Sequence, residues 1–293
     1  METAFPAKKI NSEKPIQEEQ KKDEFWQQVD CCDYCGHESF VHYMESSVPH
    51  WFKGEPIRLV RCEQCDLVMA SPRPKRQTLY ANYLEGHESA QKAVKRKLER
   101  PNINVSHTRQ IEHALKFSPD AKRLFDMGCG AGTIMQAAKE KGLEAEGNEI
   151  NLAACDHLNG LGFTAYHGFT CDLELPEDHY DIVINFDYLE HSYEPYQDLL
   201  TCNRILTDGG ILYLKTLFLG CPDHITKGEG YQLFGQGHFS YFFPRTLCSM
   251  IHSAGFKIEE LRLGNLIFVT ARKTRTPGEV EINRYRDPAY AMS

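Results

Sequence analysis

The sequence predicts an α/β protein, a sheet with helices on both faces, preceded by a small module built around cysteine pairs. From about Lys122 onward, short apolar stretches alternate with stretches of helical periodicity, and short links join them. That alternation is typical of a parallel sheet covered by helices. Upstream, two Cys-x-x-Cys pairs lie between Cys32 and Cys65, a pattern that predicts a metal-binding module rather than more of the same sheet.

Each element of the sheet domain follows from a local pattern. Short apolar runs bounded by turn residues predict strands, and apolar residues at intervals of three and four predict helices. The expected strands span 123–127, 143–149, 163–166, 182–186, 211–217, 257–263 and 266–271. The expected helices span 132–141, 152–158, 196–206 and 243–254.

Composition divides the chain into five segments. The first is charged and poor in large apolar residues, which is typical of disorder, and the last is a polar tail. The segments are 1–24 (disordered), 25–75 (cysteine module), 76–118 (a mostly helical linker or lid, broken at Pro101-Asn102), 119–275 (the sheet domain) and 276–293 (tail).

Bulk properties exclude several classes of protein. A hydrophobic content of 41% with 25% charged residues is typical of a globular protein with a sizeable core. The net charge of −8 gives no general attraction to nucleic acid or anionic lipid; the best local basic patch is 92–100. No stretch approaches the ~18 apolar residues of a membrane span, and the polar N-terminus lacks a secretory signal. We therefore expect a cytoplasmic protein. Because the cytoplasm is reducing, close cysteine pairs are interpreted first as metal ligands and not as disulfides.

A glycine-rich loop follows the first expected strand. Asp126 is followed by Gly128, Gly130 and Gly132, and the acidic Glu149 ends the next strand. Glycines allow a sharp turn and a close ligand approach, and an acidic strand end can accept hydrogen bonds from ribose hydroxyls. Dinucleotide loops have the different spacing G-x-G-x-x-G. Since a carboxylate at the strand end would repel a pyrophosphate, the loop favours a cationic sulfonium cofactor.

This loop closely resembles the first motif of class I S-adenosylmethionine-dependent methyltransferases. The resemblance continues, in the order of that family, through 179–191, 206–212 and 238–256. It implies a Rossmann-like, seven-stranded sheet and roles by position. Asp126, Gly128 and Gly130 would line the methionine part of the cofactor, with Cys129 as a small filler in the loop; Glu149 would bind the ribose; Phe169 and Thr170 would lie near the adenine; Phe186 and Asp187 would lie beneath the cofactor.

The cysteine pairs Cys32/Cys35 and Cys62/Cys65 can place four thiolates on one zinc or iron ion. The 26 residues between the pairs exceed the usual spacer of about 15–20. The stretch from Leu59 to Pro74 resembles the zinc-bearing N-terminal module of a bacterial methyltransferase subfamily, with Asp66 where that family commonly has glycine. That resemblance implies a structural zinc, distant from the chemistry, and acceptors such as nucleotide-linked sugars and natural-product intermediates.

Methyl transfer requires an aligned acceptor and often the removal of a proton. His191 follows the fourth strand at its carboxyl end, and His238 precedes an aromatic run, so we expect one of them to act as general base. Glu190, Tyr83 and Tyr241 are candidates for substrate binding, although core packing explains the tyrosines equally well. We expect a small-molecule acceptor. The alternatives are a methyltransferase acting on RNA or protein, which the net charge argues against, and a non-catalytic cofactor-binding protein.

Overall fold

The computed structural model describes residues 25–49, 56–78, 103–235, 237–274 and 277. The expected disordered N-terminus, the basic run 92–100, the Pro101-Asn102 break, Tyr83 and almost all of the C-terminal tail lie outside the described residues. Within the described part of the chain, no helix is long and apolar enough to cross a membrane.

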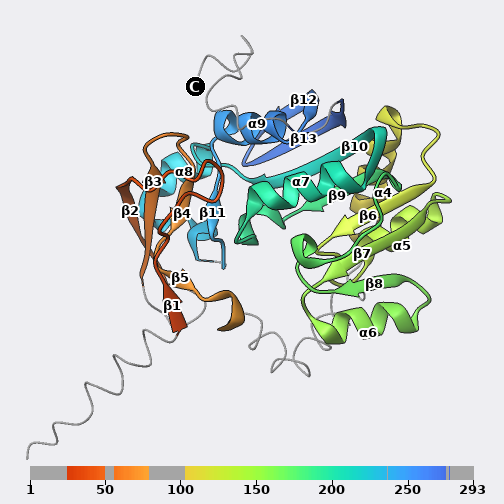
Figure 1. The fold of residues 1–293 in the computed structure, drawn as a ribbon, viewed down its shortest axis with the longest axis horizontal. Coiled ribbons are helices and arrows are strands. Elements are labelled where there is room, and N and C mark those ends of the chain that lie inside the picture. Colours follow the sequence, from red (N-terminus) through yellow and green to blue (C-terminus); the bar gives the residue numbers. More distant parts are fainter. Residues whose placement is uncertain (1–24, 50–55, 79–102, 236, 275–276, 278–293) are drawn as a thin grey trace, which may run out of the picture.

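The larger sheet has seven strands, which confirms the predicted fold class (Figure 1). The strand order is β12-β13-β10-β9-β6-β7-β8. The strands are β6 (Arg123–Met127), β7 (Glu144–Glu149), β8 (Thr164–His167), β9 (Tyr180–Phe186), β10 (Leu206–Leu217), β12 (Phe256–Leu263) and β13 (Leu266–Lys273). The order reverses between β6 and β9, so the loops after these two strands meet at a switch point, where ligands bind in sheets of this kind.

One strand departs from the expected parallel arrangement. β13 pairs antiparallel with both β10 and β12, so the sheet is mixed. The reason is the connection: β12 ends at Leu263 and β13 begins at Leu266, and so short a link can join only antiparallel neighbours.

Helices cover both faces of this sheet because its strands alternate side chains between two apolar cores. On one face Met127, Val183 and Leu214 pack against α7 and α9. On the other, Leu124 and Ile184 pack against α4 and α5. The helices are α4 (Ile103–Phe117), α5 (Thr133–Glu140), α6 (Leu152–Gly160), α7 (Pro195–Ile205) and α9 (Pro244–Ser253).

The N-terminal module forms a separate four-stranded sheet in the order β11-β4-β3-β2. Its strands are β2 (Phe40–Pro49), β3 (Pro56–Cys62), β4 (Val68–Ala70) and β11 (Ser240–Tyr241), while β1 (Trp26–Gln27) pairs with β5 (Arg73–Pro74). The long β2–β3 hairpin occupies most of the spacer between the cysteine pairs. Figure 1 shows the blue strand β11, from far along the chain, lying beside the orange strands of the module.

A segment without any expected structure connects the two sheets. It contains the helix α8 (Pro222–Lys227) and the 3-10 turns η3 (Gly228–Gly230) and η4 (Gln232–Phe234). Phe234 and Tyr231 are buried and pack with Leu59 and Val68 of the module. Residues far along the chain therefore contribute to the core beside the module's sheet.

Candidate functional site

The loop after β6 has the geometry that its glycines predict. Gly128 and Gly130 have φ angles of +66° and +55°, a region that side chains rarely adopt. A Cβ atom on Gly128 would also lie 2.6 Å from Cδ2 of Tyr188. Glu149 closes the loop, since its Oε2 accepts a 3.0 Å hydrogen bond from the Gly130 N–H and its Oε1 accepts one from the Asn151 N–H at 2.8 Å.

Asp126, the residue before the last of β6, has an unsatisfied carboxylate oxygen. Its side chain is buried and Oδ2 has no hydrogen-bond partner in the described structure. Burial, and then the nearby charge of Glu149, raise the pKa of Asp126 well above its usual value. An orphaned buried acceptor is costly unless a donor arrives, so the site fits a ligand that carries a cationic or N–H group, such as the ammonium of a sulfonium cofactor.

Cys129 lies in the same loop and is buried. A Cβ atom on Gly147 would come within 2.9 Å of its Cβ atom, so loop and strand pack closely there. Burial raises the pKa of the Cys129 thiol well above its usual value, which keeps it protonated. A protonated thiol is a poor nucleophile, so Cys129 is better described as a small side chain that fills space in the loop.

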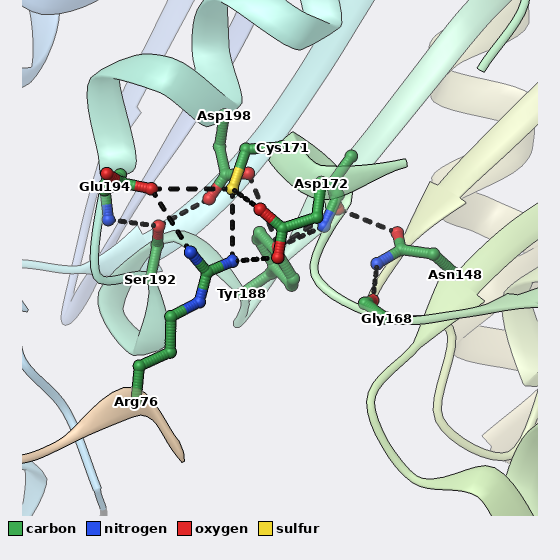
Figure 2. Close-up of polar contacts among 10 residues, drawn as sticks. Arg76, Asn148, Gly168, Cys171, Asp172, Tyr188, Ser192, Glu194 and Asp198 are labelled. Carbon is green, nitrogen blue, oxygen red and sulfur yellow. Dashed lines mark hydrogen bonds and ion pairs between the residues drawn. The ribbon is translucent and has the colours of Figure 1, made fainter. Parts of the chain in front are cut away.

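The predicted adenine side is organised by an arginine that sequence reasoning missed. Arg76 follows β5, and its guanidinium Cζ lies 4.2 Å from the ring centroid of Phe169. Its N–H groups reach Asp172 at 2.5 Å and Glu194 at 3.5 Å (Figure 2). Thr170 is buried, and its hydroxyl bonds Asn148 Oδ1 at 2.9 Å and the Tyr188 hydroxyl at 3.0 Å. Thr170 therefore shapes the loop from within.

Phe186 ends β9 and Asp187 directly follows it, and the two side chains have different surroundings. Phe186 is buried in an edge-to-face contact with Tyr213, with ring centroids 4.8 Å apart. Asp187 is exposed at a φ of +52°, and its carboxylate pairs with Lys215 Nζ at 2.5 Å. Lys215, on β10, is another residue that the sequence did not single out, because its partner is distant in the chain and directly follows the neighbouring strand β9.

Glu190, His191 and His238 meet although 46 residues separate the two histidines. The two imidazole centroids lie 4.5 Å apart. His191 Nδ1 bonds the Gly237 carbonyl at 3.0 Å, and His238 Nδ1 bonds the Leu233 carbonyl at 2.5 Å. Burial lowers the pKa of both histidines, that of His238 to about 3, and raises the pKa of Glu190 to about 7. Both imidazoles are therefore neutral at pH 7, the form that can accept a proton or bind a metal ion.

Tyr241 stabilises the loop that carries His238, one of the three clustered residues. Its side chain is fully buried, and its hydroxyl donates to the carbonyl oxygens of Phe234 and His238 at 3.1 and 3.0 Å. These bonds hold the loop that carries His238. A substrate contact for Tyr241 remains a prediction, as does one for Tyr83.

The four cysteines converge as the spacing predicts. The Sγ atoms of Cys32 and Cys65 lie 3.4 Å apart and those of Cys35 and Cys62 lie 3.5 Å apart, with all four within 4.8 Å. Tetrahedral coordination at a Zn–S distance of about 2.3 Å requires sulfur separations of about 3.8 Å. The donor set therefore fits zinc. Cys31 is exposed and is not part of the cluster.

The Methyltransferase domain family matches residues 95–261, more than half of the chain. This chain belongs to that family. Its fold agrees, since a chain of the Haloferax volcanii complex between a methyltransferase activator and a putative methyltransferase superposes with a TM-score of 0.50 at 15% identity, covering 59% of this chain and 93% of that one.

Two known proteins are similar in sequence to part of this chain. A probable S-adenosylmethionine-dependent methyltransferase of Mycolicibacterium smegmatis is 25% identical over 140 residues, 47% of this chain and 52% of the relative. A ubiquinone biosynthesis O-methyltransferase of Cereibacter sphaeroides is 30% identical over 121 residues, 39% and 48% of the two chains. The chain thus spans about half the length of these relatives. It carries a class I S-adenosylmethionine-dependent methyltransferase domain and, near its N-terminus, a four-cysteine cluster.

Proposed function

We propose that this methyltransferase transfers the methyl group of S-adenosylmethionine to a hydroxyl group of a small-molecule acceptor. The observation that carries the proposal is the meeting of two loops at the carboxyl ends of adjacent parallel strands. β6, which pairs Met127 with Asn185 of β9, leads into the glycine loop, and β9 leads into Glu190 and His191. The loop proposed to hold the cofactor and the loop proposed to meet the acceptor therefore follow neighbouring strands.

Asp126 and Glu149 are the residues proposed to hold the cofactor. The orphaned oxygen of Asp126 would accept a hydrogen bond from the amino group, and Glu149 would accept bonds from the ribose. When bound, S-adenosylmethionine supplies an electrophilic methyl group on a cationic sulfur. The carboxylate of Asp126, buried at the strand end, favours such positive charge.

A hydroxyl acceptor is proposed on two grounds. The Glu190–His191–His238 cluster offers basic atoms that could hold or remove a hydroxyl proton. One relative is named as an O-methyltransferase of ubiquinone biosynthesis, which makes a phenolic or sugar hydroxyl a reasonable first class to screen. The net charge of −8 supports a small acceptor over RNA.

The cofactor half of the proposal is tested by calorimetric titration with S-adenosylhomocysteine. Glu149→Ala should weaken binding by about 1.5–3 kcal/mol, as expected for hydrogen bonds to a charged group. Glu144→Ala is the matched control, because Glu144 lies on the same strand with its side chain 79% exposed. Equal affinities of the two variants would remove Glu149 from the cofactor site.

The acceptor half is tested by measuring S-adenosylhomocysteine release across phenols, nucleotide-linked sugars, tRNA and protein extracts. Turnover on the small hydroxyl compounds alone is expected. Turnover confined to RNA or protein, or cofactor binding without turnover on any class, would contradict the proposal. Once an acceptor is found, His191→Ala or His238→Ala should slow turnover by about 10²–10⁴-fold while cofactor affinity is kept, if acceptor activation depends on these histidines.

A further inference from the structure

Glu190, His191 and His238 each offer one ligand atom to a common point, and these atoms lie within 4.8 Å of one another. We propose that the three residues bind a divalent transition-metal ion, different from the ion of the four-cysteine cluster. The role of this ion in methyl transfer rests on the function proposed above, whereas its binding does not.

The hydrogen bonds of the two histidines decide which ring nitrogen can bind a metal ion. A carbonyl oxygen can only accept, so the ring nitrogens facing Gly237 and Leu233 must carry the proton. In a neutral imidazole the other nitrogen, Nε2, then has a lone pair. A histidine that binds a metal through one ring nitrogen almost always donates a hydrogen bond from its other ring N–H to a carbonyl or carboxylate. That bond fixes both the tautomer and the orientation of the ring.

Glu190 adds a carboxylate that needs a cation. Its side chain is 3% exposed, and Thr216 Oγ1 donates to Oε2 at 2.7 Å. In the described part of the chain Glu190 takes part in no ion pair. A buried carboxylate is costly without a partner charge, and two imidazole lone pairs beside it add repulsion. A divalent cation would satisfy all three acceptors at once.

The ligands come from two loops that hydrogen bonds lock together. Phe239 N–H donates to the Glu190 carbonyl at 2.7 Å, and the Gly237 carbonyl accepts from His191. Tyr241 secures the His238 carbonyl from the other side. The ligand geometry is thus fixed before any ion binds, which is a condition for a selective site.

The donor set indicates the class of ion. Two imidazoles and one carboxylate bind catalytic zinc, and in an open facial arrangement they bind Fe(II). Three protein ligands leave coordination positions for an acceptor oxygen. A bound hydroxyl would lose its proton to water more readily. Its oxygen would then form the new O–CH₃ bond while the pair from the broken S–CH₃ bond stays on sulfur, leaving a neutral thioether.

The test is a titration of the full-length protein, with zinc in its cysteine cluster, with Mn²⁺. Binding is measured as the loss of the electron paramagnetic resonance signal of free Mn²⁺. Soft thiolates retain zinc against Mn²⁺, so manganese reports the other site. We expect one Mn²⁺ per chain, and at least about tenfold weaker binding in Glu190→Gln, by analogy with metal-ligand losses. His113→Ala is the matched control, because His113 also faces a glutamate, Glu260 at 2.9 Å, away from the cluster.

Titration of S-adenosylhomocysteine into each variant shows that the fold is kept and separates the two proposals. Cofactor binding with no Mn²⁺ uptake and only one equivalent of zinc per chain would overturn the metal site and leave the proposed function standing. Equal Mn²⁺ affinity in Glu190→Gln and wild type would also overturn it. Mn²⁺ uptake without cofactor binding would support the metal site and contradict the function.

Discussion

Removing Arg73 should destabilise the protein far more than removing another arginine of the same module. Arg73 lies in β5 and makes two hydrogen bonds, of 2.7 and 3.0 Å, to Asp33 inside the first Cys-x-x-Cys turn. The two side chains are only 7% and 10% exposed. Breaking one partner of a buried ion pair leaves an uncompensated charge and costs about 3–5 kcal/mol. Total stabilities are about 5–15 kcal/mol, so Arg73→Met should approach the limit of folding.

The control is Arg58→Met. Arg58 pairs with Glu45 at 3.3 Å in the same module, but the side chains are 58% and 56% exposed, so the loss should be about 0–1 kcal/mol. Urea unfolding followed by circular dichroism gives both values, with zinc content measured in the same samples. Asp33→Leu combined with Arg73→Met should be less destabilised than the sum of the single changes, because no lone charge remains. Similar losses for Arg73→Met and Arg58→Met would refute the reasoning.

Three further predictions concern the metal, the cofactor and pH. Cys62→Ser should release the zinc of the four-cysteine cluster, and Cys31→Ser, whose thiol lies outside the cluster, should keep it on elemental analysis. Arg76→Ala should weaken S-adenosylhomocysteine binding a few-fold, about the 0.5–1 kcal/mol of an exposed cation–π contact, and an unchanged dissociation constant would remove Arg76 from the adenine side. Burial raises the pKa of Asp198 to about 7 from an ordinary 3.8. In the unfolded chain the Asp198 carboxyl therefore ionises at a lower pH than in the folded chain. The free energy of unfolding should fall as pH rises from about 4 to 7, by at most about 4 kcal/mol. Asp198→Asn should lose that part of the pH dependence in urea unfolding, and an identical pH profile would contradict the assignment.

The glycine loop could be predicted from sequence because its causes are local. Asp126, Gly128 and Gly130 lie within five residues, between a strand and a helix, and backbone geometry decides the rest. The four-cysteine cluster was predictable for the same reason within each pair. The unusual length of the spacer between the two cysteine pairs is explained by the antiparallel strands β2 and β3 that occupy most of it.

Other parts of the site depend on contacts between distant segments. Arg76 reaches Asp172 across 96 residues, and no pattern around Arg76 marks it. The position of His191 after β9 indicated the right edge of the sheet, but not that His238 would face it. The division into segments 25–75 and 119–275 stays a prediction, and the module shares its core with α7 and α9.

That shared packing connects the cysteine cluster to the proposed acceptor site through a short series of hydrogen bonds. Cys65 shortly precedes β4, whose Ala70 N–H donates to the Phe239 carbonyl at 2.9 Å. Phe239 N–H in turn donates to Glu190, and Phe239 directly follows His238. Loss of the ion would loosen β4, and β4 pairs with β11 only through Ser240 and Tyr241. A two-residue strand has little stability of its own, so the position of His238 depends on the module. We therefore expect the four-cysteine cluster, when it holds zinc, to stabilise the loop that carries His238 and with it one wall of the proposed acceptor site.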